Sequence, residues 1–117
     1  MTAAAQALAV AQLLGRYRFR INTERALQDD IEEALQKEGV TFAREHQLPG
    51  AGIVDFMVGR VALEVKIGGS KRDIHRQCVR YCAHADVAAL VLATSVAMGL
   101  PDIEKPTVVM SLGRAWL

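Results

Sequence analysis

An uninterrupted apolar run at residues 87–94, Val-Ala-Ala-Leu-Val-Leu-Ala-Thr, sets the strongest limit on the fold of this chain. A strand with one face in water alternates apolar and polar side chains, whereas a continuous apolar run is typical of a strand covered on both faces. A chain of 117 residues is long enough for one compact domain and too short for two. These observations predict a single α/β domain with a central sheet flanked by helices.

Further helices and strands are predicted on both sides of this run. Asn22 or Thr23 can cap a helix whose apolar residues recur at helical spacing as far as Gly39, which is well placed to end it. Further strands are predicted at 40–48, 53–58, 61–67 and 107–112, and a helix capped by Ser70 is predicted at 71–84. The element order is therefore αβββαβ with an additional strand at the end, followed by Trp116, which we interpret as a core or interface residue.

Residues 1–21 are predicted to form an N-terminal extension to a domain at 22–117. The segment from Met1 to Gly15 carries no charge; it is too short to span a bilayer and lacks the basic start of a secretory signal. Its alanine-rich composition suits a loose helix or a dimer contact. The alternating basic and apolar residues at 16–21 suit an edge strand, an arm along a nucleic-acid backbone, or a plain linker. We therefore expect a cytoplasmic protein with no membrane association.

The charge distribution excludes a protein that binds nucleic acid through bulk charge, because the formal net charge is only +1. The positive charges are nevertheless clustered, and Arg72, Arg76 and Arg80 recur every fourth residue on the predicted helix at 71–84. Such a stripe can contact phosphates, although charge runs on helices are usually solvated faces, and both interpretations of this stripe stay open. Cys78 and Cys82 share one helical face, and their spacing fits neither a disulfide nor a common zinc site.

A predicted hairpin brings two carboxylates together. The turn Gly59-Arg60 fits type II′, with glycine as the first central residue, and pairing from this turn places Asp55 opposite Glu64. Like charges opposed in this way destabilise a sheet, and Lys66 projects from the same face. A hard divalent cation such as Mg²⁺ would relieve the repulsion, since it takes oxygen ligands and keeps waters and substrate phosphates in its shell. The pattern therefore indicates phosphodiester cleavage.

With these residues identified, the sequence resembles the PD-(D/E)XK nuclease superfamily. Val54-Asp55 followed by Glu64-Val65-Lys66 is similar to its motif, with valine where proline often stands, and the element order agrees. The resemblance implies a restriction-endonuclease-like αβββαβ core with a central mixed sheet flanked by helices. It also implies that Asp55, Glu64 and the backbone carbonyl of Val65 hold Mg²⁺, with Mn²⁺ as a possible replacement, and that Lys66 positions or activates the attacking water.

Further matches extend the resemblance over most of residues 22–94. Gln77 and Tyr81 are similar to a Q-x-x-x-Y element on the helix after the active-site hairpin, where it helps to hold substrate phosphates or supports the site. Glu24 resembles the first-helix glutamate of VRR-type nuclease domains. The stretch at 39–45 is similar to the corresponding strand of phage junction-resolving endonucleases.

Helix geometry favours Glu24 as the acid that completes the site. At about 100° per residue, Glu24 falls within about 20° of Ile31 and Leu35, on the face that must dock on the sheet. Gln28 lies one turn further along the same side. Glu24 is therefore our prediction for this helix, and the position of Gln28 stays open as the alternative.

Together these features predict a Mg²⁺-dependent deoxyribonuclease, an endonuclease acting on branched or duplex DNA. The predicted catalytic residues are Glu24, Asp55, Glu64 and Lys66. The predicted nucleic-acid-binding residues are Arg72, Arg76, Gln77, Arg80 and Tyr81. The small size and limited basic surface favour a homodimer that contacts DNA through two sites. Two alternatives stay open: a catalytically inactive nuclease-fold module for DNA binding or assembly, and a structural subunit of a larger complex.

Overall fold

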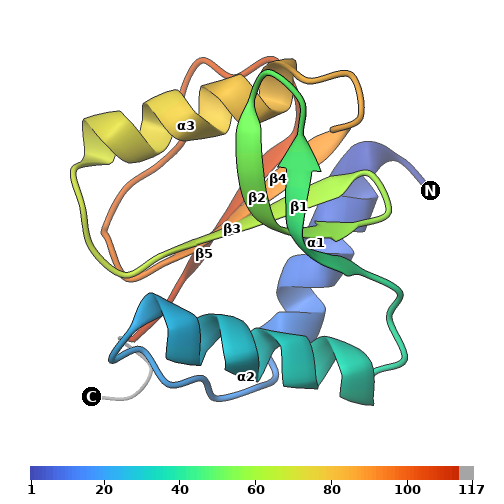
Figure 1. Cartoon of the computed structure of the whole chain (residues 1–117), viewed down its shortest axis with the longest axis vertical. Coiled ribbons are helices and arrows are strands. Elements are labelled where there is room, and N and C mark those ends of the chain that lie inside the picture. The colour runs from blue at the N-terminus through green and yellow to red at the C-terminus, as the bar shows by residue number, and fades with distance from the viewer. Residues whose placement is uncertain (114–117) are drawn as a thin grey trace.

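A computed structural model describes residues 1–113 and shows a five-stranded mixed sheet with helices on both faces (Figure 1). The helices are α1 (Ala3–Leu14), α2 (Glu24–Lys37) and α3 (Lys71–Ala83). The strands are β1 (Ala43–Leu48), β2 (Gly52–Val58), β3 (Val61–Lys66), β4 (Ala89–Thr94) and β5 (Thr107–Ser111). The predicted α/β class, with a central mixed sheet flanked by helices, is confirmed. Trp116 lies outside the described residues.

The strands lie in the order β1-β2-β3-β4-β5. The first three pair antiparallel with their neighbours, and β4 and β5 continue parallel to β3. The connection from β3 to β4 runs through α3, which gives the crossover that a parallel pair requires. All six residues of β4 are buried, so the apolar run at 87–94 does contain a strand covered on both faces, which begins at Ala89.

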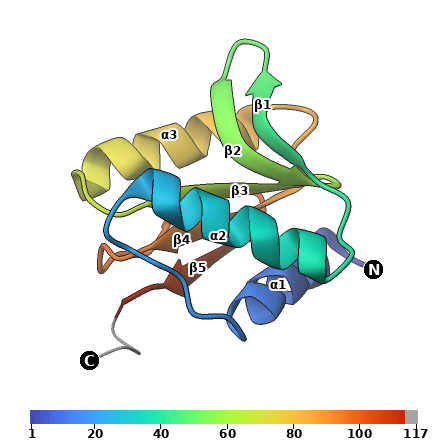
Figure 2. The ribbon, with the colours of Figure 1, turned by 60° about the horizontal axis from the view of Figure 1, so that its bottom comes forward.

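Helices lie on both faces of the sheet (Figure 2), and an apolar layer fills the space between the sheet and the helices on each face. On one face, α1 and α2 pack on the sheet through Leu14, Leu27, Ile31, Leu63 and Val91. On the opposite face, α3 packs through Ile74, Cys78, Tyr81, Ala62 and Leu92. The domain therefore has three layers, and the sheet separates α2 from α3.

Residues 1–21, predicted as an extension, contribute to the same core as the rest of the chain. Helix α1 packs against β4 and β5 and buries Ala7 and Leu14 completely. The basic segment between α1 and α2 forms no strand in the described structure. It contacts α2 instead, where Arg20 pairs with Asp30 at 2.9 Å. Neither α1 nor any other helix within residues 1–113 is long and apolar enough to cross a membrane.

The helix ends beside the sheet have the predicted caps. The Thr23 hydroxyl accepts a hydrogen bond from the Ala26 N–H at 3.0 Å, and the Ser70 hydroxyl starts α3 in the same way. Gly39 follows α2 with a φ of +70°, and the Val40 N–H bonds back to the Leu35 carbonyl at 3.0 Å, as in a Schellman motif. These caps fix where α2 and α3 begin relative to the hairpin between them in sequence.

Candidate active site

The β2–β3 hairpin carries the two carboxylates in the predicted register. Gly59 has a φ of +58°, as the first central position of a type II′ turn requires. Three cross-strand pairs follow the turn, and the last of them joins Phe56 to Leu63. Asp55 and Glu64 come next in this register. At that point the regular pairing of β2 with β3 ends.

Side chains replace backbone pairing at this position. The Asp55 N–H donates to Glu64 Oε1 at 3.2 Å, and the Val65 N–H donates to Asp55 Oδ2 at 2.8 Å. In a regular ladder these backbone N–H groups would donate to carbonyl oxygens of the neighbouring strand, and here they donate to carboxylate oxygens instead. Beyond this point β2 leaves β3 and continues with β1 as a hairpin that stands away from the sheet (Figures 1 and 2). Because the N–H and C=O of one strand residue point to the same edge, the Val65 carbonyl faces the opening between the strands.

Burial makes the two carboxylates costly to charge together. Glu64 is 2% exposed and Asp55 is half-buried. Burial raises the pKa of Asp55, and burial with the neighbouring Asp55 charge raises the pKa of Glu64 to about 8. Lys66 offers partial compensation, since its Nζ lies 3.6 Å from Glu64 Oε2. Without a cation, the pair therefore favours a state in which it retains a proton.

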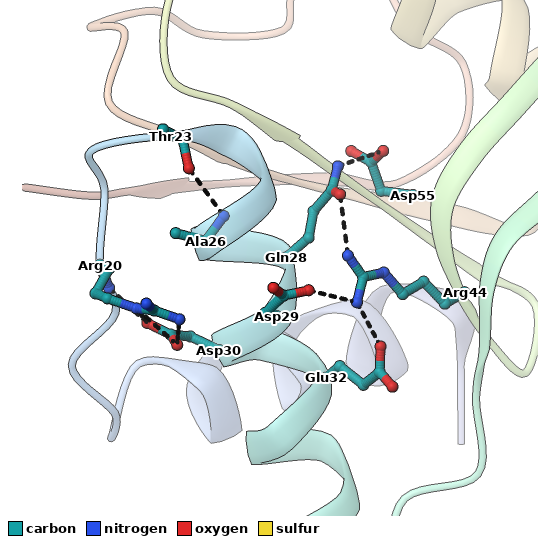
Figure 3. A network of polar contacts seen from close by, with 9 residues as sticks. All are labelled: Arg20, Thr23, Ala26, Gln28, Asp29, Asp30, Glu32, Arg44 and Asp55. Atoms are coloured by element: carbon teal, nitrogen blue, oxygen red, sulfur yellow. Dashed lines mark hydrogen bonds and ion pairs between the residues drawn. The ribbon is translucent and has the colours of Figure 1, made fainter.

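Helix α2 supplies two polar side chains to the hairpin, at different places. Gln28 Nε2 donates to Asp55 Oδ1 at 3.0 Å (Figure 3). Glu24 Oε2 instead accepts from the Ile67 N–H at 3.3 Å, just beyond Lys66. Both expected positions of α2 thus lie at the site. The alternative position, Gln28, makes the direct contact with Asp55, and Glu24 holds the end of β3.

Helix α3 supports β2 from the opposite face. The Tyr81 hydroxyl donates to the Ile53 carbonyl at 2.8 Å and accepts from Gln77 Nε2 at 2.7 Å. Tyr81 is 1% exposed, and burial with the nearby Glu64 charge raises the pKa of its hydroxyl. Of the two roles implied for the Gln77 and Tyr81 pair, this position fits support of the site, because the hydroxyl is already bonded and inaccessible.

The remaining polar residues of α3 lie on its exposed side. Arg72, Arg76 and Arg80 are all exposed, and Arg76 lies 4.0 Å from Asp73. The stripe is therefore open to solvent on a helix that begins soon after Lys66. Cys78 and Cys82 are buried on the other side of α3, as their spacing indicates.

The oxygen donors fit a hard divalent cation. Asp55, Glu64 and the Val65 carbonyl together offer two carboxylates and one carbonyl, the ligand types that Mg²⁺ prefers. Within residues 1–113, no three side chains of His, Cys, Asp or Glu gather into a metal-binding group. A cation at the hairpin would therefore depend on waters and substrate phosphates for its remaining ligands, as Mg²⁺ usually does.

Arg44 is a site residue that sequence patterns did not indicate. It lies on β1 opposite Phe56, and its guanidinium reaches α2, where Nη1 bonds Glu32 at 2.6 Å and Asp29 at 2.8 Å. Nη2 donates to Gln28 Oε1 at 3.3 Å. The register of β1 against β2 pairs Arg44 with Phe56, the residue after Asp55, and this pairing is the signal that could have placed Arg44 near the site.

No family profile, curated protein or solved structure matches this chain. The interpretation of the site therefore depends on its own geometry and on the motif that its residues form.

Proposed function

We propose that this chain is a divalent-metal-dependent deoxyribonuclease of the PD-(D/E)XK superfamily, with a restriction-endonuclease-like core. The observation that carries the proposal is the meeting of Asp55 and Glu64 where β2 leaves β3, with Lys66 Nζ 3.6 Å from Glu64. Two carboxylates at this depth cost stability unless a proton or a cation compensates them. The order of strands and helices around the hairpin supports the same proposal.

Asp55, Glu64 and the carbonyl of Val65 would hold Mg²⁺, or Mn²⁺ in its place. The ion, when bound, supplies positive charge that offsets the charge developing on the phosphate during hydrolysis. Both carboxylates take part in their charged forms, so cation binding would displace the proton that burial favours on the pair.

Lys66 would act on the reacting atoms directly. Its ammonium group has three N–H donors and no acceptor, so it can orient an attacking water and stabilise negative charge on a phosphate oxygen. Glu24 holds the backbone just after Lys66, at the Ile67 N–H, and Tyr81 holds β2 through the Ile53 carbonyl. These two contacts would keep the strands that carry the carboxylates and the lysine in a fixed relation.

DNA is the proposed substrate, in duplex or branched form, and the proposed reaction is endonucleolytic. The exposed stripe of Arg72, Arg76 and Arg80 would bind backbone phosphates beside the cleaved bond. Since one copy of the protein presents a single short arginine stripe, a homodimer would place one active site at each of two DNA strands. Sedimentation of the active protein tests this directly, and a strictly monomeric active enzyme would contradict it.

The decisive experiment measures cleavage of labelled single-stranded, duplex, flap and four-way-junction DNA with Mg²⁺ or Mn²⁺. We expect cutting by the wild-type protein, and loss of cutting in Glu64→Ala and in EDTA. Glu33→Ala is the matched control, because Glu33 is an exposed acid on α2, the same helix that carries Glu24 and Gln28. If the folded wild-type protein binds these DNAs and cuts none of them, the nuclease proposal is wrong, and an inactive nuclease-fold binding module is favoured.

A further inference from the structure

Arg44 connects β1 to three polar residues of α2, namely Gln28, Asp29 and Glu32. Its guanidinium lies over the Phe56 ring, 5.8 Å from the ring centre, and its side chain is 22% exposed. One nitrogen, Nη1, contacts the two acids Asp29 and Glu32, while the other, Nη2, contacts Gln28. Arg44 therefore divides its donors between an ion pair and an amide.

This division fixes the orientation of the Gln28 amide. Arginine has only donors and a carboxylate has only acceptors, so an amide placed between them has one favourable orientation. Gln28 Oε1 must face Arg44, and Gln28 Nε2 must face Asp55, which is the arrangement found (Figure 3). A flipped amide would place oxygen against carboxylate and N–H against guanidinium. Arg44 thus determines which atom of Gln28 meets Asp55.

The amide in turn restricts Asp55. Its Oδ1 accepts from Gln28 and its Oδ2 accepts from the Val65 N–H at 2.8 Å, so both carboxylate oxygens are held. Each oxygen keeps a further acceptor position, because an ionised carboxylate has about four. Gln28 thereby orients Asp55 without neutralising it, and the positive charge of Arg44 is matched by Asp29 and Glu32 instead.

From this chain of contacts we propose that Gln28 and Arg44 are positioning residues that hold Asp55 in the orientation for binding a divalent cation, with Arg44 acting only through Gln28. The proposal rests on the proposed function of the hairpin as a metal site. A direct Arg44–Asp55 ion pair would compete with the cation, whereas a neutral amide between them does not. Loss of a side chain that orients a metal ligand typically weakens metal binding ten- to a hundredfold, about the scale expected here.

The test measures Mn²⁺ affinity by calorimetry, without DNA, in the full chain at one pH. Gln28→Leu and Arg44→Met should each weaken binding by about tenfold. Arg44→Lys should weaken it similarly while the protein stays folded, because the single ammonium nitrogen can pair with Asp29 and Glu32 but cannot also occupy the place of Nη2 beside Gln28 Oε1. Arg20→Met is the matched control: Arg20 also pairs with an acid of α2, Asp30, but does not lead to Asp55.

The double variant decides whether Arg44 acts through Gln28. In the Gln28→Leu protein, adding Arg44→Met should change the Mn²⁺ affinity little further, since the connection is already broken. Additive losses, or equal losses in Arg44→Met and Arg20→Met, would overturn the proposal, as would unchanged affinity in Arg44→Lys and Gln28→Leu. If the wild-type protein binds no Mn²⁺, or binds it equally well as Asp55→Asn, the metal site itself is wrong and both proposals fall together.

Discussion

Replacing Glu64 with glutamine should remove a loss of folding stability that the metal-free protein suffers as pH rises. Burial raises the pKa of Glu64 from 4.5 to about 8, so the folded state prefers its protonated form. A folded-state pKa above the unfolded value stabilises the fold fully below the unfolded pKa, and this contribution is lost as pH rises through the folded pKa. Each pKa unit is worth about 1.4 kcal/mol, so the loss between about pH 4.5 and pH 9 is at most about 5 kcal/mol.

Glutamine at this position can keep the contacts with Asp55, gives up the ion pair with Lys66, and does not titrate. Its carbonyl oxygen can still accept from the Asp55 N–H, and its amide can donate to the Asp55 carboxylate. The free energy of unfolding of Glu64→Gln, relative to wild type, should therefore increase from pH 5 to pH 9 by several kcal/mol. Because the ion binds the charged pair, Mg²⁺ should stabilise the wild-type protein more at pH 9 than at pH 5.

Urea denaturation followed by circular dichroism in EDTA at pH 5, 7 and 9 measures this difference. Groups that the two proteins share cancel in the comparison, and Glu33→Gln serves as the exposed-acid control. A wild-type minus Glu64→Gln difference that is constant across this range would refute the argument that the pair is strained by its own charge.

Other substitutions test separate parts of the site. Lys66→Met should abolish cleavage and leave DNA affinity within a few fold, measured by binding and cutting of one labelled duplex; full activity would exclude a direct role. Tyr81→Phe should cost about 0.5–1.5 kcal/mol in urea denaturation, because the hydrogen bond from the Tyr81 hydroxyl to the Ile53 carbonyl is lost; an unchanged midpoint would show that the bond contributes little. Alanine at Arg72, Arg76 or Arg80 should lower the salt dependence of DNA binding by about one ion each, and an unchanged slope would mark the stripe as solvated only. Gly59→Ala should destabilise by about 1–2 kcal/mol, since its φ of +58° disfavours a Cβ.

The parts of the fold that were predicted correctly depend on local rules. The apolar run at 87–94 needs no partner to indicate a doubly covered strand, and the Gly59-Arg60 turn determines the hairpin register near it. The caps at Thr23 and Ser70 follow from side chains that bond their own helix. The register of the hairpin by itself places Asp55 beside Glu64, without any tertiary contact.

The parts that were not predicted depend on contacts between distant segments. The segment at 40–48 begins its strand only at Ala43, because Val40 and Phe42 pack on the core between α2 and the sheet. Helix α1 has no charged face from which its buried side could be predicted. Its packing through Leu14 depends on how its side chains fit against the sheet. The choice between Glu24 and Gln28 depends on where β2 leaves the sheet, and helical periodicity treats both positions alike.

Because the carboxylates accept hydrogen bonds in place of strand carbonyls, the backbone amides of Asp55 and Val65 should respond to changes at the site. The amide proton of Asp55 bonds to a carboxylate oxygen of Glu64, and that of Val65 bonds to a carboxylate oxygen of Asp55. Their chemical shifts should therefore follow the protonation of the pair and the arrival of a cation, without any label introduced at the site. A titration followed at these two amide protons would therefore report the protonation and cation binding of the carboxylate pair.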